Sequence, residues 1–76
     1  MPYKIGTKQT TKTVEQGIAK QVLVAKDADP RITGKIVELC DAAGITITWI
    51  ESMELLGDTC GIDVGAAMAA LIPDEQ

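Results

Sequence analysis

Apolar and polar residues alternate in blocks that divide this chain into short strands and helices. Residues 20–26 form an apolar, β-branched run that predicts a strand covered on both faces. Residues 45–50 give the clearest strand pattern, Ile-Thr-Ile-Thr-Trp-Ile. Between them, Asp29-Pro30 starts a helix, Gly44 stops it, and an apolar stripe lies at helical spacing: Ile32, Ile36, Leu39, Cys40 and Ala43. Strand, helix and strand joined by short turns predict a parallel, right-handed βαβ unit.

Two shorter elements precede this unit. Residues 4–6 fit a short edge strand, and residues 7–16 fit a helix with Thr7 as its N-cap and Gly17 as its left-handed stop. Val14 is the only large apolar residue of that helix, so we expect packing to stabilise it little.

The last third of the chain is less regular. Residues 52–57 fit one or two helical turns with Ser52 as N-cap, and residues 58–65 fit a loop that contains glycines. The alanines of residues 64–72 favour a helix, whereas a small mixed sheet needs a further strand, so the pattern alone leaves both open. We expect residues 73–76 to form a frayed tail.

Length and composition restrict the function. A chain of 76 residues and 8.0 kDa makes one small domain, residues 1–76. Its longest apolar run is far shorter than the roughly 20 residues of a membrane helix, and no signal sequence is visible, so we expect a cytoplasmic protein. The absence of histidine excludes Ser-His-Asp and Cys-His catalysis and most zinc chemistry. These features favour a binding protein without cofactor or metal over an enzyme.

Charge is divided unevenly along the chain. Residues 1–35 hold all seven bases and three of the acids, and residues 36–76 hold the remaining acids and no base, for a net charge of −4. This asymmetry indicates an anionic partner held on one side or, equally well, chance segregation on a solvated surface. Lys8 and Lys12 lie four residues apart on one helix face, where a bound anion would relieve their repulsion.

We expect three segments to meet in space. Residues 6–9 open a helix, whose first N–H groups and positive dipole end can bind an anion. Residues 26–28 leave the carboxyl end of a parallel strand, where α/β folds usually bind ligands. Residues 61–65 form a loop flanked by glycines that offers Ile62 and Val64, which by default are core residues at the entry to a strand.

At these residues the chain resembles a known family. Four motifs carry the resemblance: GTKQTTK at 6–12, VAKDADP at 24–30, ESM at 51–53 and LGDTCGIDVGAA at 56–67. In order and spacing they are similar to the YbxF-like bacterial branch of the ribosomal L7Ae superfamily, whose members bind kink-turn RNA. The resemblance implies an α/β fold, a three-layer α/β/α sandwich around a small four-stranded mixed sheet with residues 64–72 as its last strand. It also implies that the family's N-terminal helix is absent, which would leave one face of the sheet exposed.

The resemblance implies which residues contact RNA. A kink-turn is a duplex bent at a three-nucleotide bulge beside sheared G·A pairs, which opens the groove to a helix N-terminus. At the start of this helix, where the present chain has Lys8-Gln9, the bacterial branch commonly has Lys-Gln, and archaeal and eukaryotic relatives have Asn-Glu. By this resemblance, Gly6 lets the RNA approach the protein backbone closely, and Thr7 positions the start of the helix. Lys8, Gln9 and Lys12 face the G·A pairs, and Lys26 with the adjacent Asp27 faces the RNA backbone. Ile62 and Val64 cover an extruded base, and Asp63 accepts a hydrogen bond from that base or its sugar.

We therefore predict a monomeric, non-catalytic protein that binds and stabilises kink-turn RNA, ribosomal or regulatory, with no expected binding to DNA. An alternative is a protein-interaction module of the same fold with weak or lost RNA affinity. The acidic second half supports it, as does the absence of the lysines that related bacterial chains carry around Glu54, Leu55 and Asp58. A third hypothesis is an enzyme with Cys60 as nucleophile, although Cys40 and Cys60 lack CxxC spacing and are expected to be reduced thiols rather than a disulfide.

Overall fold

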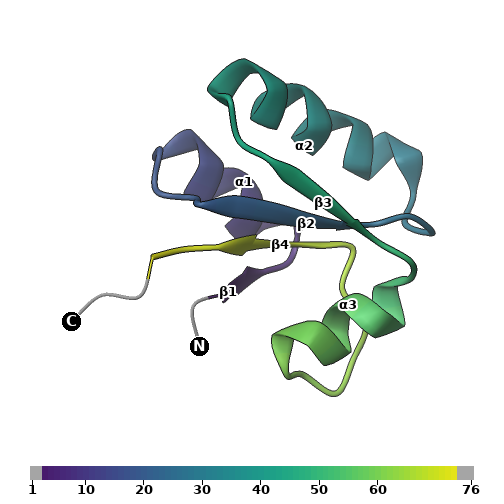
Figure 1. Ribbon diagram of the computed structural model, residues 1–76. Coiled ribbons are helices and arrows are strands. Elements are labelled where there is room, and N and C mark those ends of the chain that lie inside the picture. The colour runs from purple at the N-terminus through teal and green to yellow at the C-terminus, as the bar shows by residue number, and fades with distance from the viewer. Residues whose placement is uncertain (1–2, 74–76) are drawn as a thin grey trace.

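A computed structural model describes residues 3–73 of the chain. The elements are β1 (Tyr3–Ile5), α1 (Thr7–Glu15), β2 (Gln21–Ala25), α2 (Pro30–Ala43), β3 (Ile47–Ile50), α3 (Met53–Cys60) and β4 (Met68–Leu71). The four strands form one sheet in the order β1-β4-β2-β3 (Figure 1). β2 pairs with β3 in parallel, and β4 pairs with β1 and β2 antiparallel. The predicted mixed sheet and the parallel pairing of the βαβ unit are confirmed.

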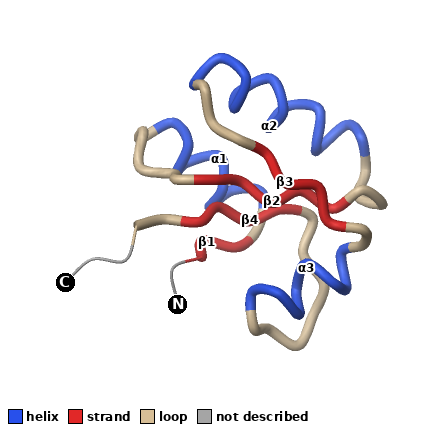
Figure 2. Tube along the Cα trace, viewed as in Figure 1, coloured by secondary structure: helices blue, strands red, loops and turns tan. Residues whose placement is uncertain are grey.

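Helices cover both faces of the sheet. Figure 2 shows α1 and α2 on one side and α3 on the other, which confirms the three-layer sandwich. The α1–α2 side encloses the first core cluster: Val14, Val22, Val24, Ile36, Cys40, Met68 and Ala70. The α3 side encloses the second: Leu23, Ala25, Ala28, Leu56, Cys60, Ala66 and Ala69. β2 supplies both clusters, as expected for a strand covered on both faces.

The sequence predicted one exposed face of the sheet without saying which, and the face on the α3 side is covered at its centre. Leu23, Ala25 and Ala69 are buried at its centre, because α3 and the loop after it pack there. Further along the same face, Tyr3 and Leu71 are half-buried. The predicted exposure is therefore wrong for the centre of this face.

Helix α2 begins and ends at the predicted signals. The Asp29 carboxylate accepts a hydrogen bond from the Arg31 N–H at 2.9 Å, and Pro30 occupies the first turn. At the other end Gly44 adopts a φ of 72°, and the N–H of Ile45 bonds to the Cys40 carbonyl at 2.9 Å. This C-terminal turn uses Ile45, so the following strand begins two residues later than predicted.

The predicted apolar stripe of α2 is only partly buried. Ile36 and Cys40 are buried, but Ile32 is 38% exposed and Ala43 is exposed. Thr33 is buried instead. The helix therefore buries a narrower face than the stripe suggests.

Helix α1 is better packed than its composition suggested. Thr10 and Thr13 are buried together with Val14. Their hydroxyls donate to backbone carbonyls, that of Thr10 to Lys4 at 3.3 Å and that of Thr13 to Gln9 at 2.7 Å. Because these bonds satisfy the hydroxyl groups, the methyl groups can pack against the sheet. The expectation that packing contributes little to α1 was wrong.

Helix α3 is longer than predicted. It continues to Cys60 rather than ending near Gly57, and Gly61 closes it with a φ of 81°. Leu56 and Cys60, four residues apart, are both buried against the sheet, and this burial extends the helix through the expected loop. Ser52 caps it as predicted by accepting from the Leu55 N–H at 3.1 Å.

The remaining boundaries shift by small amounts. β1 lies one residue earlier than predicted, and the last segment forms a strand, as the resemblance implied, over the shorter range Met68–Leu71. Of the tail expected at 73–76, Pro73 lies outside the strands and helices and is exposed, and residues 74–76 lie outside the described residues. No helix within residues 3–73 combines the length and the hydropathy of a membrane span.

Candidate nucleic-acid interface

The start of α1 differs from the starts of the other helices. Gly6, not Thr7 as predicted, is the N-cap, with a φ of 103° that favours glycine. Its N–H donates to the Met68 carbonyl at 3.0 Å, and its carbonyl accepts the first helical bond from Thr10 at 2.9 Å. No side chain caps this end and no acid lies in its first turn, whereas α2 and α3 both have side-chain caps. The first N–H groups of α1 therefore have no partner from a capping side chain.

Two of the three segments expected to meet, the opening of α1 and the end of β2, lie beside the entry to β4 at one end of the sheet. Their meeting with the loop at residues 61–65 stays a prediction. The Gly6–Met68 bond joins the start of α1 to the start of β4, and the Ala25 N–H bonds to the Ala67 carbonyl at 2.9 Å. The next N–H, that of Lys26, bonds to the Ile50 carbonyl at 2.8 Å. The sheet register thus holds the opening of α1, the end of β2 and the entry to β4 side by side.

The polar side chains of the opening turns of α1 face solvent. Thr7, Lys8, Gln9 and Lys12 are all exposed. Neither Lys8 nor Lys12 forms an ion pair with any residue between 3 and 73. Lys8 lies in the first turn, where a cation opposes the helix dipole, whereas Lys12 lies in the last turn of this short helix, where a cation is favourable. The arrangement creates a local surplus of positive charge and hydrogen-bond donors.

The turn after β2 carries one cation and one structural acid. The Lys26 ammonium lies 3.4 Å from the Glu51 carboxylate, and both side chains are largely exposed, so the pair is weak. The Asp27 carboxylate accepts from the Met53 N–H at 2.8 Å and so holds the start of α3. A contact of Asp27 with RNA stays a prediction.

Close packing against α3 positions the glycine-flanked loop. A Cβ on Gly57 would lie 2.0 Å from the Val64 carbonyl oxygen, so only glycine permits this approach. The loop is also held by a bond from the Ala66 N–H to the Met53 carbonyl at 3.1 Å. Sequence reasoning missed Gly57 by treating it as the end of a helix. The sequence did contain a signal for close packing at this position, because Gly57 is a small residue that lies between Leu56 and Cys60.

The loop side chains divide between core and surface. Ile62 is half-buried and packs against the α3-side core, as its default interpretation predicted. Val64 is 69% exposed, so its default interpretation as a core residue is wrong. Asp63 is also exposed. An exposed branched side chain beside a rigid turn is available to a ligand.

Four groups of the described chain have shifted pKa values. Hydrogen bonds from the Arg31 side chain and backbone lower the pKa of Asp29, and the same pair raises the pKa of Arg31. Burial raises the pKa of the Cys60 thiol, and it also raises that of Cys40. A buried thiol with a raised pKa is a poor nucleophile at neutral pH, which argues against the Cys60 enzyme hypothesis.

Known proteins match nearly the whole chain. The family model described as the ribosomal protein L7Ae/L30e/S12e/Gadd45 family matches residues 2–76. An RNA-binding protein of Halalkalibacterium halodurans is 49% identical over 67 residues, covering 88% of this chain and 82% of its own. The RNA-binding protein YbxF of Geobacillus stearothermophilus is 43% identical over 68 residues, covering 90% and 83%.

A solved structure shares the fold. The Giardia lamblia 15.5kD RNA binding protein superposes with a TM-score of 0.89 and 29% identity. The match covers 97% of this chain and 62% of that protein. Motifs, fold and relatives agree, and the chain belongs to the ribosomal protein L7Ae/L30e/S12e/Gadd45 family, where it is similar to the bacterial YbxF-type proteins.

Proposed function

We propose that this protein is a non-catalytic RNA-binding protein that recognises and stabilises kink-turn RNA. The uncapped, lysine-bearing start of α1 carries the proposal. A first turn that has no side-chain cap and carries the exposed Lys8 adds little to stability, but together with Lys12 one turn further on it suits an anion and the acceptor atoms of guanine. The relatives named as RNA-binding proteins support RNA as that anion.

The proposed contacts follow from the placement of the three segments. Lys8, Gln9 and Lys12 donate to guanine edges and neighbouring phosphates in the opened groove. Lys26 exchanges its weak contact with Glu51 for a phosphate. Gly6 allows close backbone approach, and Thr7 fixes the helix start.

The glycine-flanked loop completes the proposed interface. Val64, with Ile62 behind it, covers a base extruded from the bulge, and Asp63 accepts a hydrogen bond from that base or its sugar. Binding the kinked form in preference to the extended duplex shifts the RNA toward the kink.

A titration tests the proposal. The protein is titrated into a kink-turn duplex and into a control duplex whose sheared G·A pairs are replaced by Watson–Crick pairs. We expect tight binding to the first and weak binding to the second. If Lys8, Lys12 and Lys26 supply the phosphate contacts, log affinity should fall against log salt with a slope of about −2 to −3. Equal affinity for both duplexes would contradict kink-turn recognition.

The surface of α3 favours a second candidate function, a protein-interaction module. Met53, Leu55 and Val64 are 38%, 48% and 69% exposed and lie on α3 and the adjoining loop. Glu54 and Asp58 lie among them, so this surface suits a cationic partner. Recovery of a basic protein after nuclease treatment, together with no binding to the kink-turn duplex, would favour this function.

A further inference from the structure

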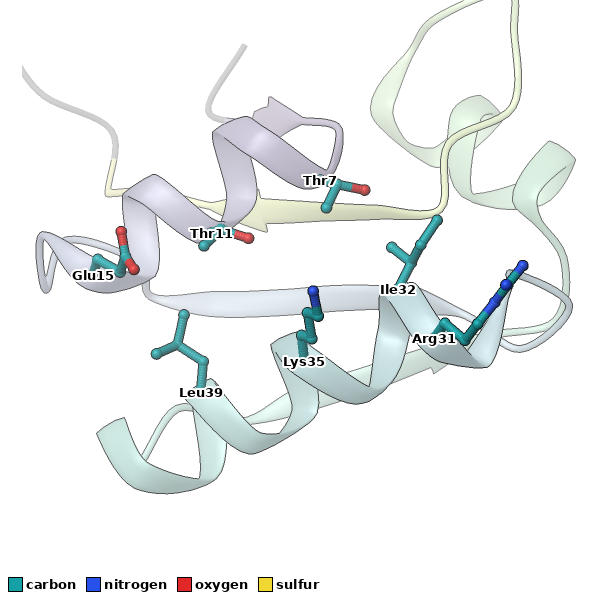
Figure 3. A pocket seen from close by; sticks show the side chains of 7 residues that line it. All are labelled: Thr7, Thr11, Glu15, Arg31, Ile32, Lys35 and Leu39. Atoms are coloured by element: carbon teal, nitrogen blue, oxygen red, sulfur yellow. The ribbon is translucent and has the colours of Figure 1, made fainter.

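A groove of about 330 Å³ lies between α1 and α2, on the side of the sheet opposite α3 (Figure 3). Its α1 wall includes Thr7 and Thr11, and its α2 wall includes Ile32, Lys35 and Leu39. Ile32 is 38% exposed although it belongs to the helical stripe that was expected to be core. The groove therefore combines the hydroxyl groups of one wall with a cation and an accessible apolar side chain on the other wall.

Lysines that have no ion-pair partner within residues 3–73 lie in and beside this groove. Lys8 and Lys12 each follow a wall residue of α1 by one position, which places them about 100° further round the helix on its outer flank. Figure 3 shows the Lys35 side chain extending from α2 into the groove toward α1. Lys35, like those two lysines, forms no ion pair with any described residue. Among the described lining residues, Glu15 at the far end of α1 is the one acid.

The groove is continuous with the proposed RNA interface. Thr7 is both the first residue of α1, beside the uncapped N–H groups, and a wall residue of the groove. At the same end Arg31 also lines the groove, where its guanidinium is held 2.8 Å from Asp29. A polyanion seated on the start of α1 thus meets a further cation, Lys35, along this groove.

We propose that one arm of the bound RNA runs along the α1–α2 groove, with a backbone phosphate held by Lys35. This inference rests on the proposed function and extends its footprint beyond the kink. The hydroxyls of Thr7 and Thr11 donate to phosphate or ribose oxygens, and Ile32 packs against a sugar. The contact reads no base, so it adds affinity without adding sequence specificity.

The test combines a protein variant with a change in RNA arm length. Lys35→Gln is titrated with a full kink-turn duplex and with two duplexes in which one arm or the other is cut to the pairs needed to hold the kink. Lys20→Gln is the matched control, because Lys20 is also exposed but precedes β2 at the opposite end of the sheet. Lys35→Arg retains the charge and should behave as the parent.

We expect Lys35→Gln to bind the full duplex about threefold to tenfold more weakly near 0.1 M salt and to reduce the salt slope by about 0.9. Its effect should vanish on one of the two shortened duplexes, which identifies the arm, while Lys20→Gln binds all three as the parent does. If Lys35→Gln matches Lys20→Gln, or loses affinity equally on every duplex, the groove contact is overturned.

The outcomes also separate this inference from the proposed function. A parent protein that prefers the G·A duplex while Lys35→Gln has no effect refutes the groove contact alone. A parent that does not distinguish the G·A duplex from its Watson–Crick control refutes the proposed function and this inference together.

Discussion

Gly57 is the described glycine at which an added Cβ would lie nearest to another atom, and its replacement by alanine gives a sharp prediction. A Cβ at this position would lie 2.0 Å from the Val64 carbonyl oxygen, 3.1 Å from its carbonyl carbon and 3.3 Å from the Gly65 Cα. All three are backbone atoms, so no side-chain rotation relieves the clash. The loop would have to move away from α3 by more than an ångström, about the shortfall from an ordinary contact.

Two effects of opposite sign decide the magnitude for Gly57→Ala. Alanine in place of a helical glycine stabilises by up to about 1 kcal/mol. Overpacking in a well-packed region destabilises by about 1–3 kcal/mol, and the displaced loop also loses the bond from Ala66 to Met53 and the packing of Ile62. We expect a net loss of about 1–2 kcal/mol in the free energy of unfolding, or about 4–16 °C in Tm for a domain of this size.

Urea denaturation followed by the fluorescence of Trp49 measures this change. Gly34→Ala is the matched control, because Gly34 lies within α2 and a Cβ there meets no atom within 4 Å. We expect Gly34→Ala to be more stable than the parent by up to about 1 kcal/mol. If Gly57→Ala is as stable as Gly34→Ala, α3 does not hold the loop by close contact, and our account of how Val64 is positioned is wrong.

Three further predictions concern groups around the interface. Asp27→Ala should lower the free energy of unfolding, measured in urea, by about 1 kcal/mol, because the Met53 N–H loses its acceptor. Asp27→Asn keeps an acceptor oxygen and should retain most of that free energy. Equal losses in the two variants would contradict the role of Asp27 in holding the start of α3. The pKa of Asp29 is lower in the folded protein, so its stabilising contribution is present above its ordinary pKa of 3.8 and is lost as the pH falls through the folded value. The stability difference between the parent and Asp29→Asn should therefore shrink as acid is added below about pH 4, and a constant difference would show that the Arg31 contact does not operate. Iodoacetamide should modify Cys60 more slowly than a free thiol at pH about 7, because burial raises its pKa and blocks access; rapid modification would revive the nucleophile hypothesis.

The sequence predicted elements best where local chemistry decides the structure. Asp29-Pro30, Gly44 and Ser52 mark helix ends by local hydrogen bonds, and each was found where expected. The neighbouring positions of the start of α1, the end of β2 and the entry to β4 also followed from strand pairing. These features depend on residues that are neighbours in the chain or on general rules of α/β connection.

What the sequence did not predict depends on contacts between distant segments. The extension of α3 to Cys60 follows from burial against the sheet, and the role of Gly57 from a loop seven residues later. Gly6 replaced Thr7 as N-cap because the bond to Met68 fixes the backbone there. Ile32 stayed exposed because no segment between residues 3 and 73 packs over the groove that it lines. Periodicity shows which face of a helix is apolar but not how much of it a partner covers.

The central claim is that the opening of α1 reads sheared G·A pairs, and the coupling between Lys12 and those pairs tests it most directly. Affinities of the parent and of Lys12→Ala are measured for the kink-turn duplex and for its Watson–Crick control, with Lys20→Ala as the variant remote from the interface. Our account predicts that Lys12→Ala loses about 1–3 kcal/mol of binding to the kink-turn and much less to the control. A loss of the same size on both duplexes would show that Lys12 contacts only the backbone, and it would contradict the proposed reading of the kink.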